Sequence, residues 1–347
     1  MKKLTILFPL FTANGFVAAC SSSTSSTAAN PDGGTSTGLL PDGGPATTGD
    51  GGVTGDAGNA PAPDWTPDGT PTTIQNVTFN GPKGWTPTAT TTDSVYTAPA
   101  MLNGVAVGTT IVDVVAPRPT VGSGEAALRA QAWPLITQAF DGHTITDPSH
   151  NATPVDGLLR GTAAQGYTFV GWDLLIDGGS TIEVHAYLAA FGTTAVPFVI
   201  RFDPSSGASR SAAELAEAEL LQTLTVPGMT PVSVADQFTE TYTLSASHIL
   251  GTYNFPGPNQ WIETIVSDFN SVQTTYQYVG AYTLDVNVMS FYPTGGTSVG
   301  APSSNYYRFY QKSDHTVAGG WTTYFCLLTA TTDSHGVKSG SEACYSR

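Results

Sequence analysis

Three groups of residues in this 347-residue chain have types and spacings that could support chemistry. The segment Gly296-Thr297-Ser298-Val299-Gly300 has the G-x-S-x-G pattern of a hydrolase nucleophile. That nucleophile requires a tight turn between a strand and a helix, so that the serine hydroxyl is exposed. Ala301-Pro302-Ser303-Ser304 follows instead, with the composition of a loop, so a glycine-serine loop is the favoured interpretation.

The other two groups contain histidine. His143, Asp147 and His150 follow a predicted helix, and they would hold a metal ion only with further ligands from elsewhere. Glu183 and His185 are two residues apart on a predicted strand, so their side chains share one face. A polar surface loop and ordinary sheet packing explain these groups more simply. We therefore assign no catalytic residue, no metal ligand and no cofactor.

Aromatic residues are concentrated in the last third of the chain. Tyr276 and Tyr278 share one face of a predicted strand, as do Tyr307 and Phe309, and Trp321 begins another strand. Such residues usually form core and cross-strand contacts. Tyrosine hydroxyls in a region of low charge also suit a cleft for a carbohydrate or an apolar ligand. These five residues are our candidates for ligand binding.

The composition favours β-structure and argues against nucleic acid as a partner. The chain has 38 Gly and 24 Pro, and its hydrophobic fraction of 40% is sufficient for packed cores. There are 12 basic and 27 acidic residues, which give a net charge of −15. Phosphate binding requires clustered Lys and Arg, which this balance does not favour.

The first twenty residues have the pattern of an export signal. Lys2 and Lys3 precede an apolar run from Leu4 to Ala19 that is too short to span a bilayer comfortably. The run ends in Val17-Ala18-Ala19-Cys20, which closely resembles the lipobox of bacterial lipoproteins. The resemblance implies a signal peptide over residues 1–19, lipidation of Cys20 and a membrane anchor of acyl chains. An ordinary signal peptide with an incidental cysteine is the alternative.

The same resemblance implies a location in the bacterial cell envelope. Ser21 follows the lipidated cysteine, which fits the outer-membrane sorting known for such lipoproteins. The other two cysteines, Cys326 and Cys344, are expected to form a disulfide in an oxidising compartment. Closing a loop of that length would stabilise the fold by about 3 kcal/mol.

Residues 20–72 are predicted to be a disordered tether. They consist mainly of Ser, Thr, Gly, Pro and Asp, and Pro31-Asp32-Gly33-Gly34 is repeated as Pro41-Asp42-Gly43-Gly44. Such a segment cannot bury enough apolar surface to offset its conformational entropy. The tether would hold the folded part of the chain away from the membrane.

Residues 73–227 are predicted to form an α+β domain. One helix is expected over Glu125–Phe140, kinked or divided at Pro134, and a second from about Ala212 to Leu224. Ser211 and Glu214 have the spacing of a capping box at the start of the second helix. Strands are predicted at residues 74–79, 105–115, 167–176, 181–191 and 196–202.

Residues 228–347 are predicted to form an all-β sandwich or a small antiparallel barrel. Short strands at this spacing favour both architectures, and a barrel leaves no open edges. The predicted strands are residues 238–244, 249–255, 262–269, 274–284, 286–292, 306–312 and 321–329.

Each predicted domain also has a family resemblance. The segment Phe79-Asn80-Gly81-Pro82-Lys83-Gly84-Trp85 resembles the opening of PsbP/Mog1-like domains, which implies a noncatalytic role. Leu250-Gly251-Thr252-Tyr253 is similar to the leucine-glycine-x-tryptophan segment of lipocalin-like modules in bacterial lipoproteins. That similarity implies a barrel of about eight strands with one small ligand in its mouth. A barrel filled by its own side chains is the alternative.

These observations predict an envelope lipoprotein with a noncatalytic binding or accessory role. Its expected partners are a membrane, through the lipid anchor, and a small molecule or a protein. An envelope hydrolase that uses Ser298, or a metal held by His143 and His150, is the second hypothesis. A structural or adhesion surface protein is the third.

Overall fold

The computed structural model describes residues 60–347, and Ala60–Arg347 is one compact unit. No helix in this part of the chain is long and apolar enough to cross a membrane. Within that range the description omits residues 64–65, 68, 83–84, 90–92, 103–104, 123, 147–157, 178–181, 204–205, 239, 247–248, 270–271, 298–299, 315–319, 333 and 335–337.

The second half of the chain forms a closed, eight-stranded antiparallel barrel. Each strand pairs with the next one in sequence, and Thr243 of the first strand, β12 (Thr241–Ala246), pairs with Ser346 of the last, β19 (Lys338–Ser346), to close the ring. The barrel is therefore the correct alternative of the two predicted architectures. Its strands are β12 (Thr241–Ala246), β13 (Ile249–Gly257), β14 (Gln260–Phe269), β15 (Val272–Asp285), β16 (Val288–Gly296), β17 (Ser303–Asp314), β18 (Gly320–Thr332) and β19 (Lys338–Ser346).

Aromatic side chains fill the core of the barrel. Phe238 follows the short helix η3 (Ala235–Gln237), and its ring contacts those of Phe255, Phe309 and Phe325. All four side chains are buried. Their edge-to-face contacts, with ring centroids 4.5–5.7 Å apart, are the geometry that aromatic pairs prefer.

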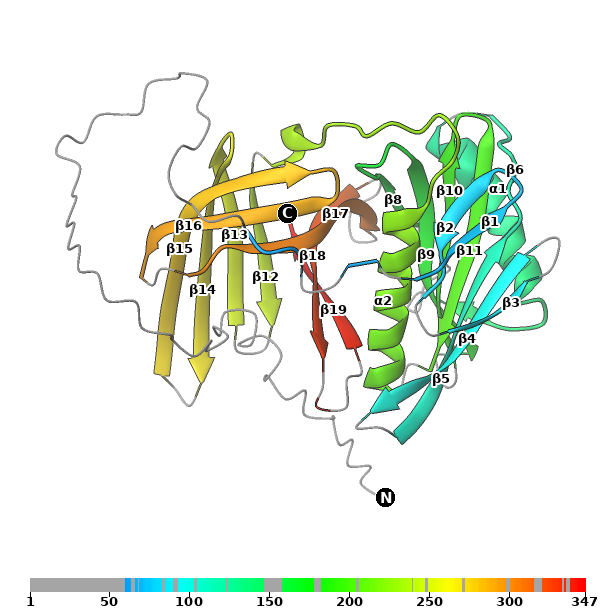
Figure 1. The fold of residues 1–347 in the computed structure, drawn as a ribbon, viewed down its shortest axis with the longest axis horizontal. Helices are drawn as coiled ribbons and strands as arrows, with labels where there is room; N and C mark the ends of the chain where they lie inside the picture. Colours follow the sequence, from blue (N-terminus) through cyan, green and yellow to red (C-terminus); the bar gives the residue numbers. More distant parts are fainter. Residues whose placement is uncertain are drawn as a thin grey trace, which may run out of the picture. The chain divides into compact units, whose positions relative to one another are not determined.

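The first half of the chain forms a second sheet with one helix on each face (Figure 1). Along β10 (Ile182–Phe191) the side chains alternate. Val184, Ala186 and Leu188 pack against α1 (Glu125–Ala139), and Tyr187 and Ala189 contribute to the core beneath α2 (Gly207–Thr223). The elements are β3 (Thr86–Ala89), β4 (Asp93–Leu102), β5 (Val105–Val115), β6 (Arg118–Pro119), α1 (Glu125–Ala139), β7 (Ile145–Thr146), β8 (Leu158–Thr162), β9 (Thr168–Ile176), β10 (Ile182–Phe191), β11 (Thr194–Phe202) and α2 (Gly207–Thr223).

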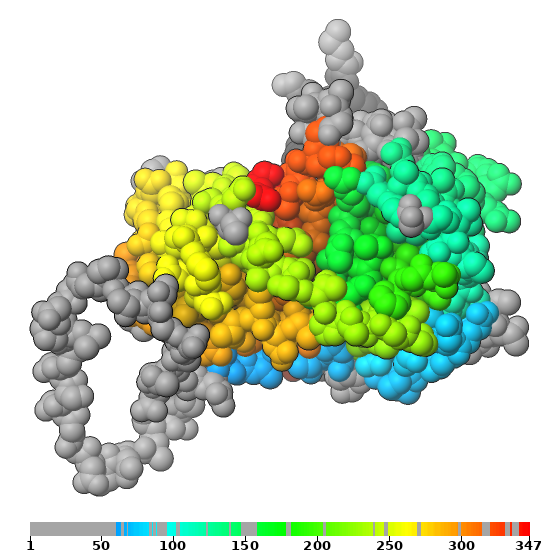
Figure 2. Space-filling model, turned by 90° about the horizontal axis from the view of Figure 1, so that it is seen from above, coloured from blue at the N-terminus to red at the C-terminus, as the bar shows by residue number. Residues whose placement is uncertain are grey.

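The hydrogen-bonded sheet continues from the first half into the barrel. Strand β17 pairs with β16 through residues 303–306 and with β8 through Gln311 and Lys312. The last strands of the barrel, orange to red in Figure 2, accordingly adjoin the green strands of the first half. Most of the aromatic barrel core lies after residue 227, and the two cores of the other sheet lie almost wholly before it.

Several elements differ from the sequence-based prediction. Residues 74–79 are not one strand, because Gln75 has a positive φ of 55° and turns the chain between β1 (Pro71–Ile74) and β2 (Val77–Asn80). Helix α2 begins at Gly207, five residues before the predicted start at Ala212. The Ser206 side chain caps it by accepting a hydrogen bond from the Ser209 N–H, 3.2 Å away, so the predicted capping box at Ser211 is not the start.

Two further differences concern α1 and the C-terminus. Helix α1 is not divided at Pro134, because one continuous helix runs from Glu125 to Ala139 with Pro134 inside it. The C-terminal segment, in which no strand is predicted after residue 329, forms strand β19. Alternating small and charged residues such as Gly340 and Glu342 concealed its β-pattern.

Candidate functional site

A polar cavity of about 310 Å³ lies between α2, the adjoining face of β9 and β10, and strands β17 and β19. Nine ionisable acidic or basic side chains line it, five acidic and four basic. They are Asp173, Glu183, Glu214, Glu217 and Glu342, and His185, Arg210, Arg308 and Lys312.

Strand and helix periodicity bring these side chains to one place. Glu183 and His185 alternate along β10 and therefore share a face, and Asp173 of β9 lies directly opposite His185. On α2, Arg210, Glu214 and Glu217 are four and three residues apart, which places them on one side of the helix. The polar cavity forms where these two faces meet.

His185 is enclosed by three carboxylates. Its Nδ1 lies 2.6 Å from Glu217 Oε2, and its Nε2 lies 3.6 Å from Glu183 Oε1 and 3.8 Å from Asp173 Oδ1. Burial alone would lower the pKa of His185, but the charges of Asp173 and Glu217 raise that pKa well above its usual value. The side chain is therefore an imidazolium at neutral pH.

Glu217 is the centre of the network. Besides His185, its carboxylate accepts hydrogen bonds from the Tyr187 hydroxyl at 2.7 Å and from Arg308 at 2.6 Å. Burial favours its neutral form, but Arg308 and His185 outweigh burial and lower the pKa of Glu217 to about 2. Glu217 is therefore a buried anion that is fully paired.

Arg308 links the helix to the barrel. Its guanidinium donates to Glu217 of α2 and also to both carboxylate oxygens of Glu342 on β19. A planar guanidinium suits this two-oxygen contact better than an ammonium would. Burial raises the pKa of Glu342, although the charge of Arg308 opposes that effect.

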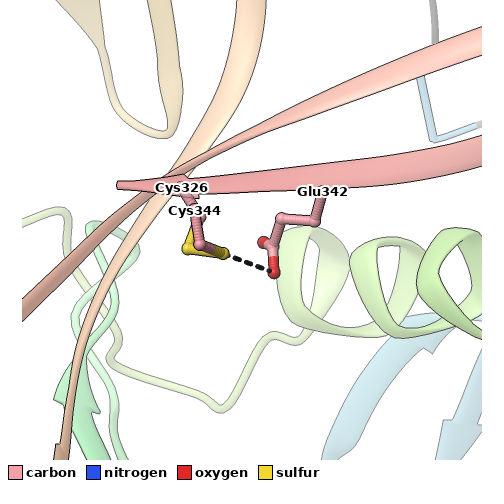
Figure 3. Close-up of side chains that lie close together, drawn as sticks. All are labelled: Cys326, Glu342 and Cys344. Carbon is pink, nitrogen blue, oxygen red and sulfur yellow. Dashed lines mark hydrogen bonds between the residues drawn. A yellow bond between two sulfur atoms is a disulfide. The ribbon is translucent and has the colours of Figure 1, made fainter. Parts of the chain in front are cut away.

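Glu342 also lies beside the disulfide (Figure 3). Cys326 and Cys344 are directly opposite each other on β18 and β19 and are bonded, as the sequence predicts. Glu342 Oε2 lies 3.5 Å from the Cys344 sulfur. The three side chains are close enough to resemble a metal site, but both thiols are consumed by the disulfide. This group is therefore not a metal centre in its oxidised form.

Glu214 is the acidic residue of the polar cavity whose charged form is stabilised least by its surroundings. It accepts a hydrogen bond from the Glu342 backbone N–H at 3.2 Å. Burial, followed by the neighbouring charge of Glu342, raises the pKa of Glu214 to about 7. In the same cavity, burial favours the neutral form of Glu183, but His185 and Arg210, which donates hydrogen bonds to it, lower its pKa. The polar cavity thus contains one carboxyl group that titrates near neutral pH, Glu214, together with two carboxylates whose pKa values are lowered, Glu183 and Glu217.

The structure places the five candidate ligand residues in different environments. Tyr307 borders the polar cavity, but its ring is buried with Phe309 in the barrel core and its hydroxyl donates to the Val286 carbonyl. Tyr278 is partly buried against the same core, and Tyr276 is 44% exposed. Trp321 stacks under Arg160, whose guanidinium carbon lies 3.6 Å from the ring centroid. The five residues therefore do not form one site.

The other candidates have mixed outcomes. Glu183 and His185 do share one face, and that face lines the polar cavity. His143 Nδ1 lies 2.8 Å from Asp177 Oδ2 at an exposed position. Asp147, His150, Ser298 and the lipidation candidate Cys20 lie outside the described residues.

Sequence reasoning missed Glu217, Arg308 and Glu342. A usable signal existed for Glu217, because it lies on the buried side of α2 with Ala213 and Leu220. A charged residue within an apolar helical face indicates a buried partner. No comparable signal links Arg308 to Glu342, because their strands, β17 and β19, come close only through the pairing of both with β18.

No protein-family model matches this chain, and no curated protein matches it significantly.

Proposed function

We propose that this chain is a lipid-anchored lipoprotein of the bacterial cell envelope that binds a small, neutral, polyhydroxylated ligand in the polar cavity. The lipobox pattern ending at Cys20 supports the anchor, and the Gly/Ser/Thr/Asp/Pro composition of residues 20–72 supports a tether. The nearly balanced charge of the polar cavity supports the ligand class, and this single observation carries the proposal.

The argument for a neutral ligand starts from the ion pairs. Five acidic groups face four basic groups, and most are already paired with one another. A strongly charged ligand would have to break those pairs at a high desolvation cost. A hydroxyl group donates one hydrogen bond and accepts others, so a sugar can use carboxylate acceptors and guanidinium or phenol donors without adding charge.

The size of the cavity fits a ligand of one sugar ring. Its volume of about 310 Å³ lies at the small end of ligand pockets. At about 30 Å³ for each liquid water molecule, a ligand would displace about ten waters. Tyr310 belongs to the same lining, and its hydroxyl, which lies 3.8 Å from the Cys344 sulfur, can supply a further polar contact.

Calorimetric titration with neutral monosaccharides tests this proposal. Tyr310→Phe removes one lining hydroxyl and keeps the ring, so we expect about tenfold weaker binding. Tyr276→Phe removes a hydroxyl from the barrel, away from the cavity, and should leave the affinity unchanged. Preferential binding of a strongly charged sugar acid or amine, or equal effects of the two variants, would contradict the proposal.

A second candidate function is acid–base hydrolysis of the same ligand. Glu214 and Glu217 line one cavity, and their environments separate their pKa values to about 7 and about 2. Such a separation suits one carboxyl group to act as an acid while another stays ionised. Release of the leaving group from an aryl glycoside, lost in Glu214→Gln with binding retained, would favour hydrolysis over binding alone.

A further inference from the structure

A second cavity, of about 220 Å³, lies beneath α1. Most of its lining is aliphatic, and we call it the apolar cavity. The aliphatic residues include Ala132, Leu135 and Ile136 of α1 and Val115, Leu188 and Val199 of the sheet. Helix α1 packs on the face opposite α2, so this cavity is separate from the polar cavity.

The cavity lies at a break in the sheet. Val114 of β5 is opposite Phe198, and Arg118 of β6 is opposite Ala195. Between these two pairs the chain advances four positions from β5 to β6 but only three along β11, so the β5–β6 side has a bulge with one extra residue. Pro197 of β11 lies at this break and also lines the cavity. A proline has no N–H to donate, which is why it is tolerated at a bulge.

The bulge places a basic side chain against an apolar space. Arg118 lines the cavity, and its Nε is buried without a hydrogen-bond partner among the described residues. A buried charged donor that lacks an acceptor is costly. A carboxylate would satisfy this guanidinium through two parallel hydrogen bonds.

We propose that the apolar cavity binds a small carboxylic acid with an apolar body, whose carboxylate accepts hydrogen bonds from Arg118. An engineered apolar cavity of about 150 Å³ in another protein holds benzene. The apolar cavity is larger, so it accommodates an aromatic ring on a short chain. Asp113 and Gln138 also line it. Because Asp113 repels an anion, net attraction of the carboxylate depends on Arg118.

Calorimetry with the purified protein tests this site with two probes of the same shape. 3-Phenylpropanoate carries the carboxylate, and 3-phenylpropanamide is its neutral match. We expect the acid to bind more tightly than the amide. Arg118→Gln should weaken the affinity for the acid by about 10- to 100-fold and leave the affinity for the amide unchanged. Arg210→Gln, in the polar cavity, is the matched control and should leave binding of both probes unchanged.

Two filling variants test whether the probes enter the apolar cavity. Ala132→Leu fills the cavity from a buried position on α1, and Leu135→Trp fills it from a partly exposed position that is more tolerant of a large ring. Either variant, once shown by circular dichroism to be folded, should abolish binding of both probes. Equal affinity for acid and amide, full retention of acid binding in Arg118→Gln, or binding that survives both filling variants would overturn the proposal.

Discussion

Replacing Glu214 with glutamine should remove a pH-dependent loss of stability. A carboxyl group whose pKa is about 7 in the folded protein, against 4.5 normally, binds its proton more tightly when folded. Its stabilising contribution is complete below pH 4.5 and is lost as the pH rises through 7. The difference of about 2.5 pKa units corresponds to about 3 kcal/mol.

Glutamine keeps the oxygen that accepts the Glu342 N–H but does not titrate. The stability of Glu214→Gln relative to the wild type should therefore rise by about 3 kcal/mol between pH 4 and pH 8.5. Two other groups act in the same direction. Burial raises the pKa of Glu263 to about 7, and neighbouring carboxylates raise the pKa of His185, so each also makes the folded protein less stable as the pH rises. Both are present in the wild type and the variant, so the comparison isolates Glu214.

Urea unfolding at a series of pH values measures this effect. With a slope of about 3 kcal/mol per molar urea, the relative midpoint of the variant should move by about 1 M across the range. Glu217→Gln is the matched control, because the pKa of Glu217 is lowered to about 2 and its contribution is lost only as the pH falls below about 4.5. A stability difference for Glu214→Gln that stays constant from pH 4 to pH 8.5 would refute the account of its environment.

Three further predictions concern the buried network, the disulfide and the anchor. Arg308→Met leaves the buried Glu217 without its main cation and should cost about 3–5 kcal/mol, or about 6–10 °C in thermal denaturation, and a loss below 1 kcal/mol would contradict the pairing. Replacing Cys326 and Cys344 together by serine should cost about 3 kcal/mol in urea unfolding, and an unchanged midpoint would contradict a stabilising crosslink. Cys20→Ser should no longer partition with membranes or incorporate labelled palmitate, and the lipobox hypothesis is wrong if it still does both.

Local sequence patterns predicted most of the strands. Residues 105–115 form β5 with the predicted bounds, and the strands predicted after residue 249 each correspond to one strand of the barrel. Alternation of apolar and polar residues is a local property, so one sequence is enough to find it. Strand β19 was missed because Lys338–Ser346 carries few large apolar residues and gains its strand pairing from β18.

The candidate site was largely beyond such patterns. Glu183 and His185 could be placed on one face, because their spacing is local. Glu217, the partner of His185, comes from a helix 32 residues further along the chain, and Arg308, the partner of Glu217, comes from a barrel strand another 91 residues on. Pairing over that distance depends on how β17 continues from β16 to β8, and that is decided by the tertiary fold.

The central claim is that the polar cavity binds a neutral, polyhydroxylated ligand, and native mass spectrometry tests it most directly. The protein would be incubated with neutral mono- and disaccharides and compared with Ala218→Trp, a variant that fills the polar cavity from α2. The account predicts a discrete added mass of one sugar that is lost on denaturation and is absent in Ala218→Trp. No added mass with any sugar, or the same added mass in the filled variant, would contradict it.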